Sequence, residues 1–191
     1  MKVRDSFFVI AALLFTASVG AQEVQIIRAS NLALRQELLD LQEVDQRVRL
    51  AKPNEPAAWK EVDLQNLAQL KVIVEKNGWP TISMVSKDGA LAAFLIAQHA
   101  NSDPDFQRRV LAMMEPMLKT GEVESPLYAY LYDRTHTPQR YGTQGTCAGK
   151  GKWTPRAIEA PAKVDERRAA IKMVPLKLAE YAAWVGEKSC P

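Results

Sequence analysis

Helical periodicity is the feature that most constrains what this chain can fold into. Apolar residues recur at three- and four-residue steps along most of its length, and the alternation typical of half-buried strands is almost absent. One such stripe is Ile27, Leu34, Leu38, Leu41 and Val48. Stripes of this kind mark the buried faces of amphipathic helices. The sequence therefore predicts an all-α fold, a single compact domain of about six or seven helices.

Proline and glycine indicate where these helices begin and end. Asp103-Pro104 and Ser125-Pro126 combine an N-cap residue with a proline at the first helical position, and Pro116 is expected to bend its helix. We expect helices over residues 24–50, 57–77, 89–100, 104–120, 126–134, 162–173 and a shorter one from Pro175 to about 185. No convincing element falls within residues 136–160, which we predict to be one long ordered loop.

The N-terminal segment has the three parts of a secretory signal peptide. Lys2 and Arg4 precede an apolar run over residues 7–17, and Val19-Gly20-Ala21 places small residues at a cleavage site. An N-terminal membrane anchor is the alternative, but a run of about eleven residues is too short to span a bilayer. We predict a signal peptide over residues 1–21 and a mature domain over 22–191. The protein is then periplasmic or secreted, with no stable membrane anchor after cleavage.

Charge and cysteine content narrow the function further. The net charge is only +3 and no dense basic run is present, which argues against a nucleic-acid partner. The two cysteines are Cys147 and Cys190. We predict that they form a disulfide because an exported protein meets an oxidising compartment. Two free thiols are the alternative.

Polar residues occupy several positions where the helical pattern calls for an apolar side chain. Asp45 lies on the first stripe, four residues after Leu41. His99 follows Leu95 and Ile96 at the end of the most apolar helix. Burying such groups is costly unless each has a partner, so these positions are candidates for an internal network or a site. The set on predicted inner faces or helix ends is Asp45, Asp63, Asn66, His99, Asp133, Arg134 and Arg168.

The stretch from Asp133 to Gln144, DRTHTPQRYGTQ, is rich in planar hydrogen-bonding groups and contains no aliphatic side chain. We interpret it as one wall of a pocket. Its ligand-binding candidates are Gln139, Tyr141, Thr143 and Gln144, which would form a lid over the buried polar residues. We expect His136 to be an exposed loop residue.

Two interpretations of these polar residues remain open. In the structural one, Asp45 and Asp133 pair with Arg134 and Arg168, and His99 lies against a helix C-terminus. In the other, the same groups line a pocket. We predict no metal and no cofactor, because two histidines without ligand spacing are a weak metal signal. The sequence also contains no nucleophile elbow and no phosphate-binding glycine motif.

Several of these residues belong to a pattern that resembles a bacterial domain-of-unknown-function family, DUF6624. The resemblance covers roughly residues 38–181 and implies no activity. Members usually carry a glycine shortly after the Trp-Pro, where this chain has Met84-Val85-Ser86. The matching marks are Asp45 to Arg47, Asp63 with Asn66, Gly78-Trp79-Pro80, Gln98-His99-Ala100, Asp133-Arg134, Gln139, Tyr141-Gly142-Thr143-Gln144, and Asp165 with Arg167-Arg168.

Three classes of function follow. The favoured one is a binding protein for a small polar or anionic ligand or a peptide end, in which Arg134 and Arg168 would clamp an anionic group. The second is a hydrolase or transferase, with His99 as general acid or base and Asp133 as a further catalytic candidate. The third is a structural or partner-binding domain whose polar core is internally satisfied. The sequence leaves open whether the protein is an enzyme.

Overall fold

The computed structural model describes residues 29–52 and 55–190. The predicted signal peptide and the first residues of the expected N-terminal helix lie outside this part. Within it, the chain forms seven α-helices, two short 3-10 helices and one pair of strands. The prediction of a mainly helical fold is confirmed.

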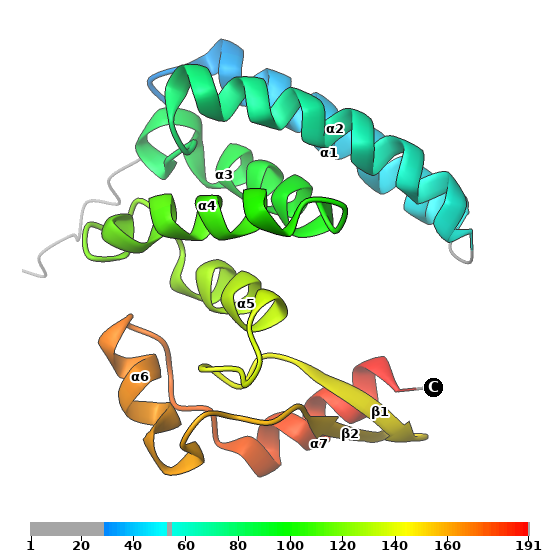
Figure 1. Cartoon of the computed structure of the whole chain (residues 1–191), viewed down its shortest axis with the longest axis vertical. Helices are drawn as coiled ribbons and strands as arrows, with labels where there is room; N and C mark the ends of the chain where they lie inside the picture. The colour runs from blue at the N-terminus through cyan, green and yellow to red at the C-terminus, as the bar shows by residue number, and fades with distance from the viewer. Residues whose placement is uncertain (1–28, 53–54, 191) are drawn as a thin grey trace, which may run out of the picture.

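The first two helices form an antiparallel pair at one end of the molecule (Figure 1). Helix α1 (Leu32–Ala51) begins at Asn31, whose side chain accepts a hydrogen bond from the Leu34 N–H at 3.0 Å. Helix α2 (Pro56–Asn77) begins with a proline and ends at Gly78, which has a φ of 73°. The apolar residues that these two helices bury are Leu34, Leu38, Leu41, Leu67, Leu70, Ile73 and Val74. The predicted stripes are thus the faces that these helices bury.

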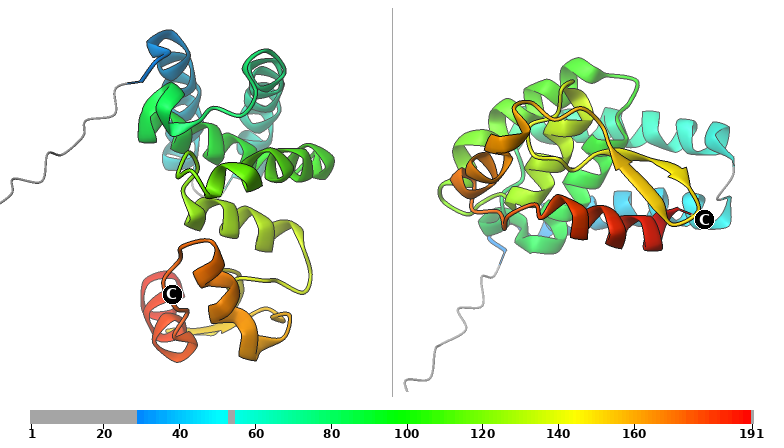
Figure 2. Two further views of the ribbon diagram at one scale, coloured as in Figure 1. Left: turned by 90° about the vertical axis from the view of Figure 1, so that its left-hand side faces the viewer. Right: turned by 90° about the horizontal axis from the view of Figure 1, so that it is seen from below.

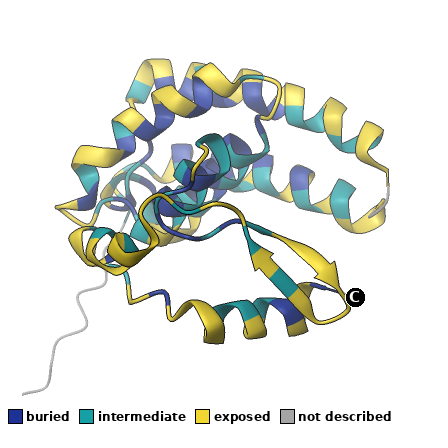
Figure 3. Ribbon diagram, turned by 60° about the horizontal axis from the view of Figure 1, so that its bottom comes forward, coloured by how far each residue is buried: buried dark blue, intermediate teal, exposed yellow. Residues whose placement is uncertain are grey.

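Three further helices complete the helical core. Helix α3 (Ile82–His99) packs against α1 and α2, and it is followed by α4 (Pro104–Met114) and α5 (Ser125–Thr135). The α-helical hydrogen bonding of α4 stops before Pro116, and the chain continues as the 3-10 helix η1 (Glu115–Leu118). The change agrees with a proline that cannot donate a backbone hydrogen bond. Buried residues gather on the facing sides of these helices (Figure 3).

The C-terminal part corrects one sequence prediction. Residues 136–160 contain an antiparallel hairpin of β1 (Gly145–Gly149) and β2 (Lys152–Pro155) instead of continuous loop. It is followed by η2 (Pro161–Lys163), α6 (Val164–Ala170) and α7 (Leu178–Ser189). Figure 2 shows α7 running beside the hairpin. The strands carry no alternating apolar pattern, so the sequence contained little signal for them.

Contacts with α7 hold the hairpin in place. The predicted pairing is present as a disulfide between Cys147 of β1 and Cys190, directly after α7. The ring of Trp153 meets that of Tyr181 edge-on, with 5.4 Å between the centroids. A side chain at Gly186 would collide with the backbone oxygen of Gly151, so glycine permits the close approach. The hairpin therefore depends on tertiary contacts.

In the described part of the chain, none of the helices is both long enough and apolar enough for a membrane span.

Helix α3 begins seven residues earlier than the sequence predicted, because Thr81 caps it and accepts a hydrogen bond from Met84 N–H at 3.3 Å. The helix is interrupted at Ser86, which has φ 61° and ψ 173°. Glycine alone adopts this backbone conformation readily. Ser86 lies in the segment where the resemblance to DUF6624 departs from the family glycine. The geometry explains why a glycine suits this segment.

Replacing Ser86 with glycine should stabilise the protein. Relief of the strained backbone should raise the free energy of unfolding by about 1 kcal/mol or more, as measured by urea denaturation. Ser83→Gly is the matched control, since Ser83 lies within the regular first turn of α3. Glycine there should cost about 0.5–1 kcal/mol. A loss of stability in Ser86→Gly would contradict the argument.

Candidate functional site

The predicted site residues fall into two groups. Helix α5, which contributes one residue to each group, lies between the part formed by α1–α4 and the C-terminal part (Figure 1). The first group lies where α1, α2 and the C-terminal ends of α3 and α5 meet. The second lies between α5 and α6, around the segment that follows α5. The first contains Asp45, Asp63, Asn66, His99 and Arg134, and the second contains Asp133, Gln139, Tyr141, Thr143, Gln144 and Arg168.

In the second group, Asp133 organises the segment after α5. Its side chain is fully buried. The carboxylate accepts backbone N–H groups from Arg140 at 2.7 Å, Tyr141 at 3.0 Å and Thr143 at 2.9 Å, and it also accepts the Thr143 hydroxyl at 2.9 Å. Several donors to one buried carboxylate offset its loss of hydration. Asp133 therefore serves the fold of this segment.

Two further members of the second group, Gln139 and Arg168, bond to backbone. Gln139 donates to the carbonyls of Gln144 at 2.9 Å and Arg156 at 2.8 Å, and its own oxygen accepts the Gln144 N–H at 2.8 Å. Arg168 donates to the Tyr141 carbonyl at 2.8 Å. These contacts fasten the segment to itself and to α6. A lid or ligand-binding role for these side chains stays a prediction.

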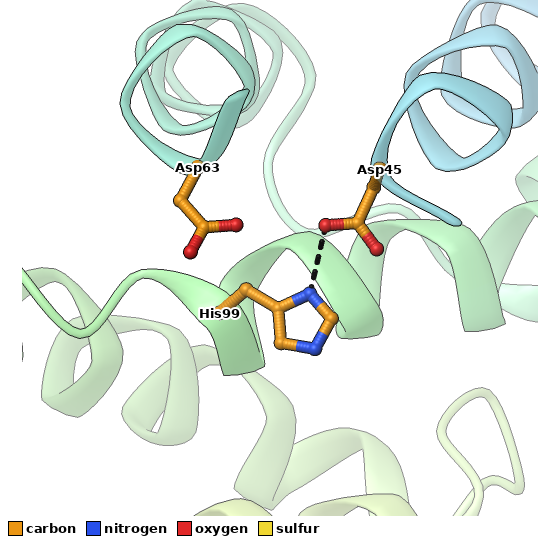
Figure 4. A group of neighbouring side chains, drawn as sticks. All are labelled: Asp45, Asp63 and His99. Carbon is orange, nitrogen blue, oxygen red and sulfur yellow. Dashed lines mark hydrogen bonds and ion pairs between the residues drawn. The ribbon is translucent and has the colours of Figure 1, made fainter. Parts of the chain in front are cut away.

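In the first group, three helices bring Asp45, Asp63 and His99 together (Figure 4). Asp45 projects from α1, Asp63 from α2, and His99 is the last residue of α3. His99 Nδ1 lies 2.9 Å from Asp45 Oδ1, and the Asp45 side chain is only 1% exposed. Among the described residues, no hydrogen bond to His99 Nε2 is formed. The pair is an aspartate–histidine dyad with one ring nitrogen free.

Arg49 joins the two carboxylates, and the sequence analysis missed it. Its Nη2 lies 3.0 Å from Asp45 Oδ1 and also forms an ion pair with Asp63. Its guanidinium carbon lies 5.3 Å from the centre of the Trp59 ring, a cation–π contact. The sequence did contain a sign of this ion pair, because Arg49 is four residues after Asp45 and so lies on the same helical face.

The two carboxylates ionise differently. Burial is the largest influence on Asp45 and opposes its ionisation. Hydrogen bonds from His99 and Arg49 outweigh it, so the pKa of Asp45 is lowered. For Asp63, burial dominates over the attraction of Arg49, and the negative charge of Asp45 adds to the effect, so its pKa is raised. Asp45 is the group that remains ionised as the pH falls, as a partner for His99 requires.

Arg49, Asp63 and His99 border a cleft of about 670 Å³, whereas the buried Asp45 is not part of its lining. Helix α2 forms one side, and the other includes the last turn of α3, the residues after it and the end of α5. Asn66 is not part of the lining, since it is buried between α1 and α2 and donates to the Leu41 carbonyl at 3.2 Å. The cleft is lined by Arg49, Pro56, Trp59, Lys60, Asp63, Leu64, Gln98, His99, Asn101, Ser102 and Arg134.

Two cations on this lining carry uncompensated charge. Arg134 donates from Nη2 to the Asn101 side-chain oxygen at 2.9 Å, and its buried Nε has no hydrogen-bond partner. Lys60 is exposed. Within residues 29–52 and 55–190, neither forms an ion pair with a carboxylate. The cleft therefore offers positive charge that no carboxylate of the described residues neutralises.

Comparison with known proteins decides the family. The model of a family described as "Family of unknown function (DUF6624)" matches residues 32–187. The chain belongs to the DUF6624 family. The resemblance noted in the sequence is thus confirmed. No curated protein and no solved structure matches the chain.

Two expectations about this DUF6624 protein need correction. Asp45 pairs with Arg49 and His99, and not with Arg134 or Arg168. The reason is local, because Arg49 is one helical turn away. His136 is half-buried instead of exposed: its ring stacks on Tyr132 with centroids 4.0 Å apart. Helix α5 extends to Thr135, which places His136 one turn after Tyr132.

Asp45, Asp63 and His99 also each offer a ligand atom, and these atoms lie within 4.8 Å of one another. Carboxylate oxygens and imidazole nitrogens are suitable ligands for divalent metals. Arg49, however, already donates to both carboxylates and supplies the positive charge between them. A metal ion would have to displace it.

The lowered pKa of Asp45 predicts a pH-dependent effect of Asp45→Asn. At pH 7 the variant should lose about 2–3 kcal/mol of unfolding free energy, because a buried charged acceptor is removed. The difference in unfolding free energy between variant and wild type should shrink as the pH falls below about 3.9. Protonation of Asp45 then removes the same charged contacts in the wild type. Urea denaturation at several pH values measures it.

We expect Asp63→Asn to show the opposite pH dependence of stability from Asp45→Asn. Because the pKa of Asp63 is raised in the folded protein, ionisation of Asp63 disfavours folding. The wild type should gain stability relative to this variant as the pH falls through the raised pKa. Parallel pH dependences of the two variants would contradict the assignment of different ionisation behaviour.

Proposed function

We propose that this protein binds a small anionic ligand in the cleft between α2 and the ends of α3 and α5. The observation that carries the proposal is the uncompensated charge of Arg134 and Lys60 on its lining. A concave site with a few converging polar groups is the usual form of a small-molecule site. An anion would replace the carboxylate partners that these two cations lack.

The chemistry of the lining fits this role. A guanidinium can donate two parallel hydrogen bonds to a carboxylate or phosphate. Asn101 already holds one Arg134 nitrogen, which limits the motion of the side chain. Gln98 and Ser102 add neutral hydrogen-bonding groups nearby. His99 contributes an imidazole whose Nδ1 is engaged by Asp45.

We also propose that the protein acts after export, in the periplasm or outside the cell. The charged, apolar and small-residue regions at its N-terminus support this, and the Cys147–Cys190 disulfide fits an oxidising compartment. The partner we propose is a small polar or anionic solute, or the end of a peptide. The charge balance gives no support to a nucleic-acid partner.

Inorganic phosphate is a suitable first probe of the anion site. We expect Arg134→Gln to weaken phosphate binding by about 10-fold or more, because charge-assisted hydrogen bonds are lost. Isothermal titration calorimetry at constant ionic strength measures the change. Arg47→Gln is the matched control, since Arg47 is exposed on α1 and does not line the cleft. Equal affinity in wild type and Arg134→Gln would refute the proposal.

The dyad supports a second candidate, acid–base catalysis on the bound ligand. Asp45 holds Nδ1 of His99, which leaves Nε2 to accept or donate a proton. A positioned carboxylate of this kind fixes the orientation of a catalytic imidazole. Hydrolysis or group transfer would fit this arrangement. The candidate depends on the dyad and not on the charge of Arg134.

Chromogenic nitrophenyl phosphate and nitrophenyl acetate test this candidate. If either is turned over, His99→Ala should lower kcat by about 100-fold or more. His136→Ala should leave kcat unchanged, because His136 stacks on Tyr132 and does not line the cleft. Turnover that survives in His99→Ala, or no turnover by the wild type, would exclude acid–base catalysis on these substrates.

A further inference from the structure

We infer that the ligand of the cleft is an organic anion that carries a planar ring, and that Trp59 and Leu64 receive the ring while Arg134 holds the anionic group. The inference rests on the proposed anion site and specifies the class of ligand for it. Three observations carry it: the size of the cleft, the apolar residues of α2, and the way in which Trp59 is held.

The size of the cleft exceeds what an inorganic anion requires. A water molecule takes about 30 Å³ of liquid, so 670 Å³ corresponds to about twenty waters. Pockets of about 300–1,000 Å³ generally hold organic ligands. A phosphate bound at Arg134 would leave most of the volume to water. A larger body attached to the anion would fill it.

The apolar part of the lining lies on α2. Pro56, Trp59 and Leu64 lie within little more than two turns of its N-terminal half, together with Lys60 and Asp63. Leu64 is 42% exposed, a large fraction for a leucine beside a cleft. The lining residues outside α1 and α2 are polar or charged: Gln98, His99, Asn101, Ser102 and Arg134. The lining therefore suits a ligand with one apolar and one anionic part.

Trp59 is held in a definite orientation. Its indole N–H donates to the Lys52 carbonyl at 2.8 Å, and its ring contacts the Arg49 guanidinium. The polar atom of the indole is thus satisfied within the protein, and the rest of the side chain offers apolar surface. Planar rings stack on tryptophan and on guanidinium groups. Trp59 and Arg49 together favour a flat ring over a branched aliphatic group.

The charged groups around the cleft are consistent with a ligand that has one anionic end. Asp45 and Asp63 share the single positive charge of Arg49. With Arg134 and Lys60, the group has three cations against two carboxylates, so positive charge still predominates. Repulsion from the Asp63 carboxylate would keep the anionic group near Arg134, so that the ring lies along the apolar residues of α2. The charge distribution thus orients the ligand.

The test compares two pairs of probes. Within each pair, a phenyl ring in one probe replaces a methyl group in the other: phenyl phosphate with methyl phosphate, and benzoate with acetate. Affinities are measured by calorimetry at constant ionic strength with the full mature protein. We expect the wild type to bind phenyl phosphate about 10-fold more tightly than methyl phosphate. The carboxylate pair shows whether the anionic end is of the phosphate or the carboxylate class.

Substitutions then locate the ring. Trp59→Ala should abolish the preference for the phenyl compound while leaving the affinity for methyl phosphate unchanged. Leu64→Gln, at an exposed position that does not endanger folding, should reduce the preference in the same direction. Trp184→Ala is the matched control, because Trp184 is 58% exposed on α7, away from the cleft lining. It should retain the full preference.

The possible failures are distinguishable. If the wild type binds both members of a pair equally, the ring inference is overturned and the anion site stands. If it binds none of the four probes and no inorganic phosphate, both proposals are overturned. A ring preference that persists in both Trp59→Ala and Leu64→Gln would place the ring elsewhere and also overturn the inference.

Discussion

The buried carboxylate of Asp45 is the interaction on which the helical core and the cleft both depend. An aspartate inside a protein is tolerated only when hydrogen bonds and opposite charge replace its hydration. Here the donors come from Arg49 and Gln46 of the same helix and from His99 of α3. Arg49 also reaches Asp63 of α2. Asp45 therefore links α1 to α3 and, through Arg49, to α2, and it holds two residues that line the cleft, His99 and Arg49.

The C-terminal part repeats this principle with a different type of donor. Asp133 is as deeply buried as Asp45, but most of its partners are backbone N–H groups of the segment that follows α5. Its hydrogen-bonding capacity is consumed by the fold of that segment. The Asp45 network leaves His99 Nε2, Arg134 and Lys60 beside a cleft. A buried polar group is thus not by itself evidence of a binding site. The better evidence is a polar atom that has no partner within the protein and faces a cleft.

The sequence identified the polar residues of the interior better than their partners. Asp45, Asn66, Asp133 and Arg168 were selected as polar residues on predicted inner faces or at a helix end, and all four are buried. Helical periodicity reports which side of a helix a residue occupies. It does not report which residue of another helix lies opposite. For that reason the structural interpretation, in which Asp45 pairs with Arg134 or Arg168, was wrong. Arg49 was overlooked although it lies four residues after Asp45 on the same helix.

The sequence by itself determined the helical class, most helix ends, the residues buried between helices and the cysteines available for a disulfide, because these follow from local spacing and from proline and glycine chemistry. Only the tertiary structure decided that the hairpin at 145–155 exists, since its strands are held by α7 and the Cys147–Cys190 bond. Only the tertiary structure also showed that the polar residues form two separate groups, one around Asp45 and His99 and one around Asp133. Their members come from helices distant in the chain, and local spacing contains no information on how such helices meet.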